Sequence, residues 1–291
     1  GIYNTRVESS TVGKEYYQQL LTYLRRSGSN QTVSINCDVL VNIDLNQVFH
    51  LHNTTKGPIT VVYKKLPKKD ISDVNAILEI DETDHVRSHK LFDNKSTDEL
   101  FNMSTDIFVV DTPWLIERLE EEAQKEYPEK LRYVLRDLAA KEGAFAYEYT
   151  GYLANIHSVQ SYYQANIDML ESKKFYSLFS PNQKIYTKVK NEEPTYYANT
   201  SKVSTSQFAS GSIIEGEVVQ SVLSRNIYVH KDSVVKNSIL FPRVVIGQGA
   251  QVEYAILDKG VEVADGVVIR GTAENPVVVK KGEKVTEDIH S

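Results

Sequence analysis

The residue best placed to do chemistry is an aspartate at the end of a strand-like run. Residues 32–38 read TVSINCD, and Asp38 closes this run. Because ligand crevices form where the strands of a parallel sheet end, we expect Asp38 to face such a crevice. A carboxylate there could hold Mg²⁺ against substrate phosphates, since Mg²⁺ prefers oxygen ligands and usually takes only one or two from the protein. The alternative is that Asp38 only caps a turn.

Other reactive side chains give weaker indications. Cys37 has strand residues beside it and no cationic neighbour in the sequence, so we expect a small buried residue rather than a nucleophile. His50 and His52 are two residues apart, which places them on different faces of a helix and argues against a metal pair. The pairs Lys64–Lys65 and Lys68–Lys69 are expected to be solvated, with an anion-binding effector site as the alternative.

Apolar residues in the C-terminal third recur at steps of six, six and five, so that the pattern repeats every 17 residues. A hexapeptide period places one inward aliphatic residue on each of three flat faces per coil, and stacked coils bury these residues in one continuous column. The pattern therefore predicts a left-handed parallel β-helix over residues 206–291. The predicted core residues are Leu223, Val229, Val235, Leu240, Ile246, Val252, Leu257, Val263 and Ile269.

His230 falls at a predicted corner of this β-helix. In β-helix acyltransferases a histidine at such a corner acts as the general base, in a groove between subunits. The array is short here and the N-terminal portion is large, so an acyltransferase stays an alternative from another functional class. A scaffold that binds no ligand is a further alternative.

The N-terminal portion alternates helical and strand patterns, which favours an α/β domain with a largely parallel sheet. Strands are predicted at 32–43, 57–66, 76–80, 86–92, 107–110 and 144–149, and helices at 14–26, 112–125, 129–141 and 158–170. The strands at 76–80 and 86–92, joined around Glu82–Asp84, are expected to form a hairpin. The chain therefore divides into an α/β domain over residues 1–178, a polar linker over 179–205 and the β-helix over 206–291.

The composition limits the classes of partner. The net charge of -6 gives no basic footprint for nucleic acid or an anionic membrane. No apolar run approaches the roughly 20 residues that span a bilayer, and the single cysteine fits a reducing compartment. We expect a cytoplasmic protein. Its 18 tyrosines, against one tryptophan, are expected mainly at domain seams and subunit contacts.

Two adjacent segments carry a resemblance to a known family. Residues 151–158 read GYLANIHS and residues 161–170 read SYYQANIDML, and they are similar to the GYWRDVGT box and the SYWEANMDLL run of ADP-glucose pyrophosphorylases. Residues 212–216 and 237–240 resemble the β-helix signatures of that family. The resemblance implies a truncated Rossmann-like nucleotidyltransferase domain followed by the β-helix. It also implies about a hundred preceding residues that carry the family's glycine-rich GxGxRL loop, which this sequence lacks.

The family transfers an adenylyl group from ATP to glucose 1-phosphate, with Mg²⁺ neutralising the developing charge. Of its two metal-binding aspartates, the first matches Asp38 and the second falls on Asn155, whose neutral side chain implies weak binding of Mg²⁺. The GTADA box of the family falls on residues 11–15, TVGKE, without a match. Its FxEKP box falls near residues 89–93, where only Lys90 or Lys95 could bind the sugar phosphate.

These departures indicate a subunit released from catalytic constraint, which resembles the GlgD-type regulatory subunits of glycogen biosynthesis. We therefore expect a catalytically weak or inactive regulatory subunit of glucose-1-phosphate adenylyltransferase. It would form a hetero-oligomer with a catalytic subunit and respond to a sugar phosphate or another metabolite. The alternative within the family is an active ADP-glucose pyrophosphorylase that uses Asp38 alone, so the sequence leaves open whether the chain is an enzyme.

Overall fold

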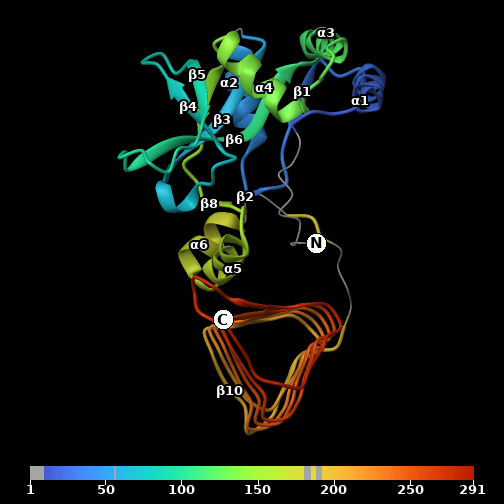
Figure 1. The fold of residues 1–291 in the computed structure, drawn as a ribbon, viewed down its shortest axis with the longest axis vertical. Coiled ribbons are helices and arrows are strands. Elements are labelled where there is room, and N and C mark those ends of the chain that lie inside the picture. The colour runs from blue at the N-terminus through green and yellow to red at the C-terminus, as the bar shows by residue number, and fades with distance from the viewer. Residues whose placement is uncertain (1–9, 56, 180–184, 188–191) are drawn as a thin grey trace. The chain divides into compact units, whose positions relative to one another are not determined.

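The computed structural model describes residues 10–55, 57–179, 185–187 and 192–291. Its contacts divide the chain into two compact units, residues 1–155 and 156–291 (Figure 1). This division differs from the predicted boundary at residue 178, because the segment after residue 155 packs with the β-helix. Of the predicted linker 179–205, residues 180–184 and 188–191 lie outside the described residues, as do residues 1–9 and 56 of the first unit.

The first unit is built on a six-stranded sheet with the order β5-β4-β6-β3-β7, in which β1 also pairs with β6. Its strands are β1 (Gln31–Ser34), β3 (Ile59–Pro67), β4 (Ala76–Ile80), β5 (Val86–Leu91), β6 (Leu100–Asp111) and β7 (Phe145–Glu148). A separate antiparallel pair joins β2 (Val39–Val41) to β8 (Leu153–Asn155). The predicted strand at 32–43 is therefore two short strands, separated by the bend that contains Asp38.

The prediction of a largely parallel sheet is wrong. Among the described strands of this sheet only β3 and β7 pair in parallel as neighbours, whereas β6 is antiparallel to β1, β3 and β4. A tight turn at Asp81–His85, with Asp84 at φ 60°, joins β4 to β5 and makes them a hairpin. A turn this short can connect only antiparallel strands, because parallel strands need a long crossover.

Helices cover both faces of this sheet. The helices of the first unit are α1 (Lys14–Ser27), α2 (Leu45–Thr55), the short 3₁₀ helix η1 (Lys68–Asp70), α3 (Thr112–Ala123) and α4 (Leu131–Lys141). Because side chains alternate along a strand, Phe108 and Val110 of β6 pack in the cluster that includes α1, α3 and α4. Ile107 and Val109 lie in the cluster on the other face, with Val48 of α2.

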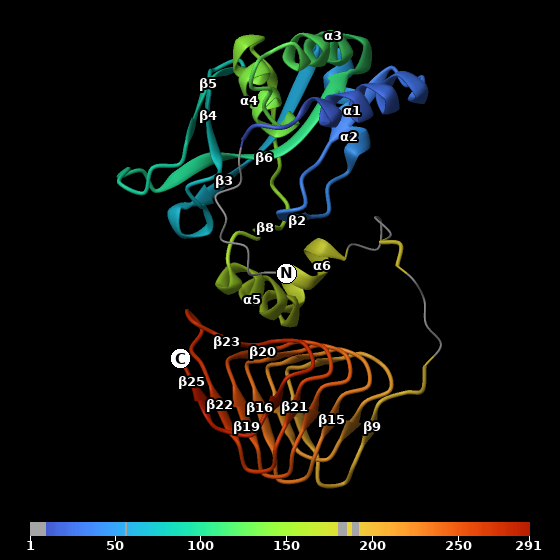
Figure 2. The ribbon, with the colours of Figure 1, turned by 45° about the vertical axis from the view of Figure 1, so that its right-hand side comes forward.

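The second unit is a left-handed parallel β-helix of three sheets, seen end-on in Figure 1 and from the side in Figure 2. We name its faces by their first strands. The β9 face contains β9 (Tyr196–Tyr197), β12 (Ile213–Ile214), β15 (Tyr228–Val229), β18 (Val245–Ile246), β21 (Glu262–Val263) and β24 (Lys284–Val285). The β10 face contains β10 (Lys202–Ser204), β13 (Glu217–Val219), β16 (Val234–Lys236), β19 (Gln251–Glu253), β22 (Val268–Arg270) and β25 (Ile289–His290). The β11 face contains β11 (Gln207–Phe208), β14 (Val222–Leu223), β17 (Ile239–Leu240), β20 (Ala255–Leu257) and β23 (Val277–Val279).

The nine residues of the hexapeptide pattern lie in the β-helix interior and are at most 3% exposed. They stack in register, as in the column Leu223, Leu240 and Leu257 on the β11 face. One coil alone would leave these side chains in water, so the stack itself supplies the hydrophobic burial.

Three short helices precede the β-helix: α5 (Val159–Ile167), the 3₁₀ helix η2 (Asp168–Leu170) and α6 (Ser172–Leu178). The α5 helix begins at Ser158, whose side chain forms a reciprocal capping box with Ser161. Its Tyr163 is buried against the β11 face, and the Tyr163 hydroxyl donates to the carbonyl oxygen of Asn237 at 2.7 Å. In the described part of the chain no helix is long and apolar enough to cross a membrane.

Candidate functional site

The site around Asp38 is built on a bulge in β6. Val62 of β3 pairs with Ile107, but the next residue, Tyr63, pairs with Ser104, so Thr105 and Asp106 are left out of the ladder. The Thr105 hydroxyl donates to the carbonyl oxygen of Val62 at 2.8 Å, and Asp106 takes a φ of 54°. Such a bulge redirects a side chain that a regular strand would place elsewhere. Here the Asp106 carboxylate is only 2% exposed.

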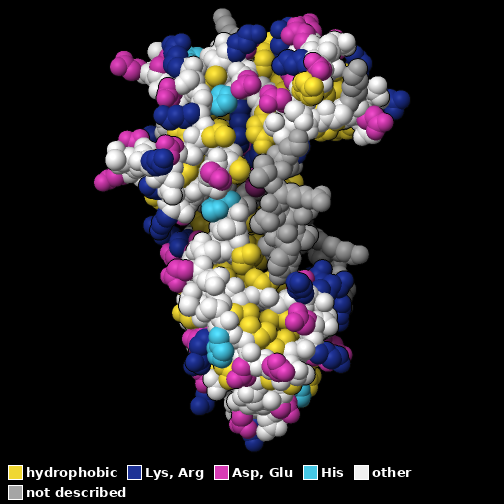
Figure 3. All heavy atoms as spheres, viewed as in Figure 1, with side chains coloured by type: hydrophobic (Ala, Val, Ile, Leu, Met, Phe, Trp, Pro, Cys, Tyr) yellow, Lys and Arg dark blue, Asp and Glu magenta, His cyan; other side chains and the backbone are white. Residues whose placement is uncertain are grey.

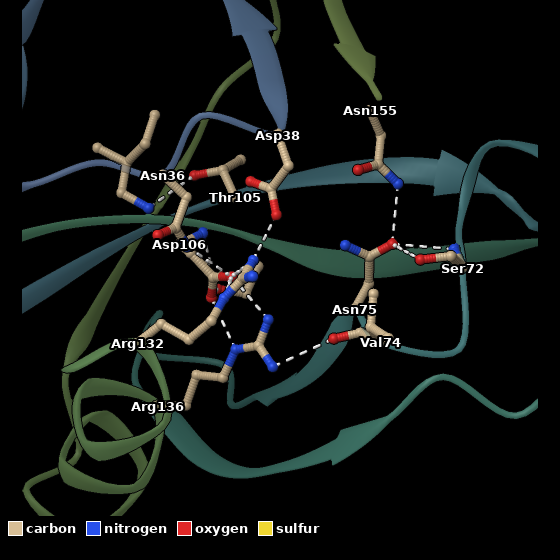
Figure 4. Close-up of polar contacts among 12 residues, drawn as sticks. Asn36, Asp38, Ser72, Val74, Asn75, Thr105, Asp106, Arg132, Arg136 and Asn155 are labelled. Carbon is tan, nitrogen blue, oxygen red and sulfur yellow. Dashed lines mark hydrogen bonds and ion pairs between the residues drawn. The ribbon is translucent and has the colours of Figure 1, made fainter. Parts of the chain in front are cut away.

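Two arginines of α4 bind this buried carboxylate. Arg136 makes a bidentate contact, with Nε 2.8 Å from one Asp106 oxygen and Nη2 2.6 Å from the other. Arg132 lies one helical turn earlier, and its Nη2 is 2.8 Å from Asp106 Oδ2. The same Nη2 is 2.5 Å from Asp38 Oδ2, so one guanidinium joins both aspartates (Figure 4). Two carboxylates and two guanidinium groups balance in charge, which is how charged groups are tolerated away from water.

The electrostatics keep Arg132 charged. Burial lowers the pKa of its guanidinium, but the charge of Asp106 and the hydrogen bonds to Asp38 and Asp106 outweigh this effect and raise the pKa. Asp38 therefore faces a permanent cation supplied by the protein. It lies in the bend after the antiparallel strand β1, so the expectation that it ends a strand of a parallel sheet is wrong.

The pairing of β2 with β8 brings the two expected metal positions together. Val39, the residue after Asp38, is the register partner of Asn155. Asn155 is 6% exposed, and its amide nitrogen donates to the carbonyl oxygen of Asp70 at 3.0 Å and to Asn75 Oδ1 at 2.8 Å. The Asn75 oxygen also accepts from the backbone N–H of Ser72, which fixes it as an acceptor. Asn155 Oδ1 is buried and has no hydrogen-bond partner among the described residues.

The surroundings of Asn155 require an amide rather than a carboxylate. Both groups that face its nitrogen are acceptors, and an ionised aspartate has no proton to donate to them. Asp38 and Asn155 thus offer any cation one carboxylate that already contacts a guanidinium and one neutral amide oxygen (Figure 4). Nowhere in the described residues do three or more His, Cys, Asp or Glu side chains gather as a metal site.

The two lysines considered for a sugar phosphate lie on exposed elements. Lys90 is on the edge strand β5, where its Nζ is 3.4 Å from Glu79 Oε1 and its side chain is 67% exposed. Lys95 is in the exposed loop that follows, and its backbone N–H donates to Asp93. By contrast Lys64, which was expected to be solvated, is half-buried, and its Nζ is 2.7 Å from the carbonyl oxygen of Gly151. Burial lowers the pKa of Lys64. The hydrogen bond from Lys64 to Gly151 holds in place the segment that leads into β8.

The remaining candidates take no part in this site. Cys37 is exposed, because it lies in the bend between β1 and β2, so the expectation of a buried residue is wrong. His50 is exposed, whereas His52 is buried between Thr60, at 2.8 Å, and Asp111, at 3.3 Å.

Asp106, Arg132 and Arg136 were not among the residues predicted from the sequence. Two signals for them were present in the sequence. The polar triplet at 104–106 interrupts an apolar strand, and the two arginines stand four residues apart on a predicted helix, where side chains share a face.

Comparison with known proteins gives matches along most of the chain. Residues 188–287 match the family described as GlmU-like, C-terminal hexapeptide. The chain is 35% identical over 183 residues to the glycogen biosynthesis protein GlgD of Bacillus subtilis, which covers 62% of this chain and 52% of that protein. It is 27% identical over 273 residues to a glucose-1-phosphate adenylyltransferase of Bacillus cytotoxicus, covering 92% of this chain and 71% of the relative. The chain thus spans about half the length of GlgD.

Proposed function

We infer that this chain, which belongs to the ADP-glucose pyrophosphorylase family, is a regulatory subunit of glucose-1-phosphate adenylyltransferase in glycogen biosynthesis. Its own reaction centre is catalytically weak or inactive. It acts in a hetero-oligomer with a catalytic subunit.

The observation that carries this proposal is the hydrogen bonding of Asn155. A single Asp-to-Asn exchange in an unchanged pocket would leave the amide among groups suited to a carboxylate. Here the amide nitrogen of Asn155 instead has two acceptors, Asp70 O and Asn75 Oδ1, within hydrogen-bond distance. The neighbours therefore favour the neutral side chain.

The ion pair at Asp38 supports the same conclusion. Mg²⁺ binds oxygen ligands at about 2.0–2.1 Å and demands near-ideal octahedral geometry. The Arg132 guanidinium contacts Asp38 Oδ2 and places a positive charge beside the ligand that a metal would use. Two cations so close repel each other strongly where water is scarce. The donor set does not fit a tightly bound Mg²⁺, and we derive no catalytic step through one.

The parts that resemble the family in sequence also serve the fold. The run at 161–170 forms α5 and η2, and the α5 helix packs on the β-helix. The hexapeptide residues form its core. A chain that keeps this scaffold but not its metal ligands is suited to assembly and to the transmission of an effector's binding energy between subunits.

The test compares the full-length natural protein, its catalytic subunit and their mixture for ADP-glucose formation from ATP and glucose 1-phosphate. We expect the protein alone to show a small fraction of the catalytic subunit's rate. In the mixture we expect a higher turnover or a stronger response to a phosphorylated or carboxylate metabolite. A rate per chain equal to that of the catalytic subunit, in a preparation free of it, would show instead an active pyrophosphorylase. No change on mixing would exclude the regulatory role.

A further inference from the structure

The three outer faces of the β-helix are covered differently. On the β11 face the outward side chains Ile239 and Ile256 are apolar, and Tyr163 of α5 packs over them. On the β10 face ion pairs connect neighbouring coils, and these are Glu217–Lys236 at 3.1 Å and Glu253–Arg270 at 3.3 Å. An apolar face is thus covered and a charged face is left to water, as hydrophobic burial requires.

The β9 face departs from this rule. Its outward residues in the first four coils are in register and form an apolar ladder, which we call the β9-face ladder: Tyr196, Ile213, Tyr228 and Val245. Tyr196 is 62% exposed and Ile213 is 40% exposed, while the other two are half-buried. The next two coils place Glu262 and Lys284 in the same column, 2.9 Å apart as an ion pair. The apolar character of the ladder therefore ends after the fourth coil.

A second column runs beside the ladder and adds charge to it. Glu215 follows Ile213 by two residues in the second coil, and His230 follows Tyr228 by two residues in the third. The His230 ring stacks on Tyr228, with ring centroids 3.8 Å apart. Burial, together with the nearby charge of Glu215, raises the pKa of Tyr228. An acidic and a basic group thus lie next to each other on adjacent coils.

We propose that the β9-face ladder is the contact surface for a second copy of this chain. The two copies would be related by a twofold axis that lies in the interface, parallel to the strands, between the second and third coils. This operation reverses the order of the coils and keeps each column opposite its own copy. The first coil then faces the fourth coil of the partner, and the second coil faces the third.

The ladder is complementary to itself under this operation. Tyr196 meets Val245 of the other copy and Ile213 meets Tyr228, so every contact opposes a large aromatic ring to a smaller branched side chain. Alternating large and small residues across facing sheets is what allows them to interdigitate at about 10 Å. In the second column the same operation sets Glu215 opposite His230, which pairs opposite charges when the histidine is protonated. Such reciprocal contacts define an isologous interface.

The register also explains where the apolar ladder stops. The fifth and sixth coils have no counterpart in this arrangement, because the twofold axis pairs only the first four. Their outward residues Glu262 and Lys284 would remain in water at the rim, where interfaces are usually polar. The inference does not depend on the catalytic status of the chain, and it predicts a contact between identical subunits in addition to any contact with a catalytic partner.

The test uses the full-length natural protein in sedimentation equilibrium, without its catalytic partner. Val245→Asp places a carboxylate in the ladder, and we expect it to raise the dimer dissociation constant by about a hundredfold or more. Val234→Asp is the matched control, since Val234 is also a half-buried outward valine, but on the β10 face. It should leave the dimer intact. A wild-type protein that is monomeric at micromolar concentration, or a Val245→Asp dimer as tight as the wild type, would overturn the proposal.

A charge exchange distinguishes a second copy from other occupants. Glu215→Arg alone sets two basic groups opposite each other, and His230→Glu alone sets two acidic groups opposite each other. Both should weaken the dimer, whereas the double variant should restore it, because each contact contains one residue from either copy. If the single variants weaken only the association with the catalytic subunit and the double variant does not recover, the surface binds that subunit and not a second copy. Melting curves of each variant control for loss of folding.

Discussion

Arg132 and Asp38 form an ion pair, with 2.5 Å between Nη2 and Oδ2, across 94 residues of sequence. The same nitrogen reaches Asp106 in the bulge of β6, at 2.8 Å. A side chain of α4 therefore connects the bend after β1 to the centre of the sheet. The Arg132 guanidinium thus fixes the carboxylate of Asp38, which matches a metal ligand in the family.

Arg132 is expected to stabilise the first unit. Replacing it with methionine should lower the free energy of unfolding by about 3 kcal/mol, since the buried Asp106 and the partly exposed Asp38 lose a shared cation. Urea unfolding followed by the fluorescence of Trp114, the only tryptophan and part of this unit, measures the change. Arg25→Met is the control, because it breaks an ion pair with Glu120 at the surface. The Arg25 and Glu120 side chains are 55% and 47% exposed, so the loss of this pair should cost less than about 1 kcal/mol. Equal losses would show that the buried pair is no more important than the exposed one.

Asn155→Asp should destabilise the protein rather than restore a metal site. The new carboxylate would face the oxygens of Asp70 and Asn75, so we expect a loss of about 2–4 kcal/mol. Asn155→Ala removes the same hydrogen bonds without adding a buried charge and should cost about 1–2 kcal/mol. The Trp114 signal serves again, with and without Mg²⁺. An aspartate variant as stable as the wild type, and stabilised further by Mg²⁺, would contradict the proposed loss of the metal.

Leu240→Asp should unfold the β-helix locally or completely. Leu240 is fully buried between Leu223 and Leu257, and an unpaired charge there should cost about 4 kcal/mol or more. Circular dichroism during thermal unfolding detects the change. Gln251→Asp, at an exposed outward position of β19, is the control and should melt close to the wild type. If both variants melted at similar temperatures, the buried position of Leu240 in the β-helix core would be wrong.

Tyr63 is expected to make stability fall at alkaline pH. Burial, together with the charge of Glu148 and its hydrogen bond, raises the pKa of Tyr63 from 10.0 to about 12. Between these values the unfolded chain releases the proton and the folded protein keeps it, so stability is full below pH 10 and is lost as the pH rises toward 12. Between pH 10 and 12, Tyr63→Phe should make the fall of the unfolding free energy with pH less steep, by about 1.4 kcal/mol per pH unit. Tyr127→Phe, which alters a residue that is 69% exposed, should leave the slope unchanged.

Acidic and basic side chains are interspersed on the face shown in Figure 3, without a large patch of one sign. This agrees with the small net charge of the sequence. This face therefore has no extended region of one sign that would attract a charged partner.

The β-helix could be predicted because its pattern is local. Each inward residue, such as Leu223 or Ile246, is specified by a spacing of five or six positions, and the coils from Leu223 to Ile269 repeat that spacing. The β4–β5 hairpin could be predicted for a similar reason, since its turn residues stand between the two strands. The match of Asp38 and Asn155 to metal positions came from the family resemblance, and the structure placed them in adjacent register through β2 and β8.

The tertiary structure alone decided the direction of the sheet and the partners of Asp38. The strands β1, β3 and β6 pair over separations of tens of residues, and no local period states whether they run parallel or antiparallel. The bulge that turns Asp106 inward depends on the register between two such strands. Only after this pairing does the buried carboxylate meet Arg132 and Arg136, because charged groups leave water only where a partner is already in place. The sequence thus determined which residues stand at the positions that match the family's metal ligands, and the packing of α4 against the bulge decided that the Arg132 side chain contacts Asp38.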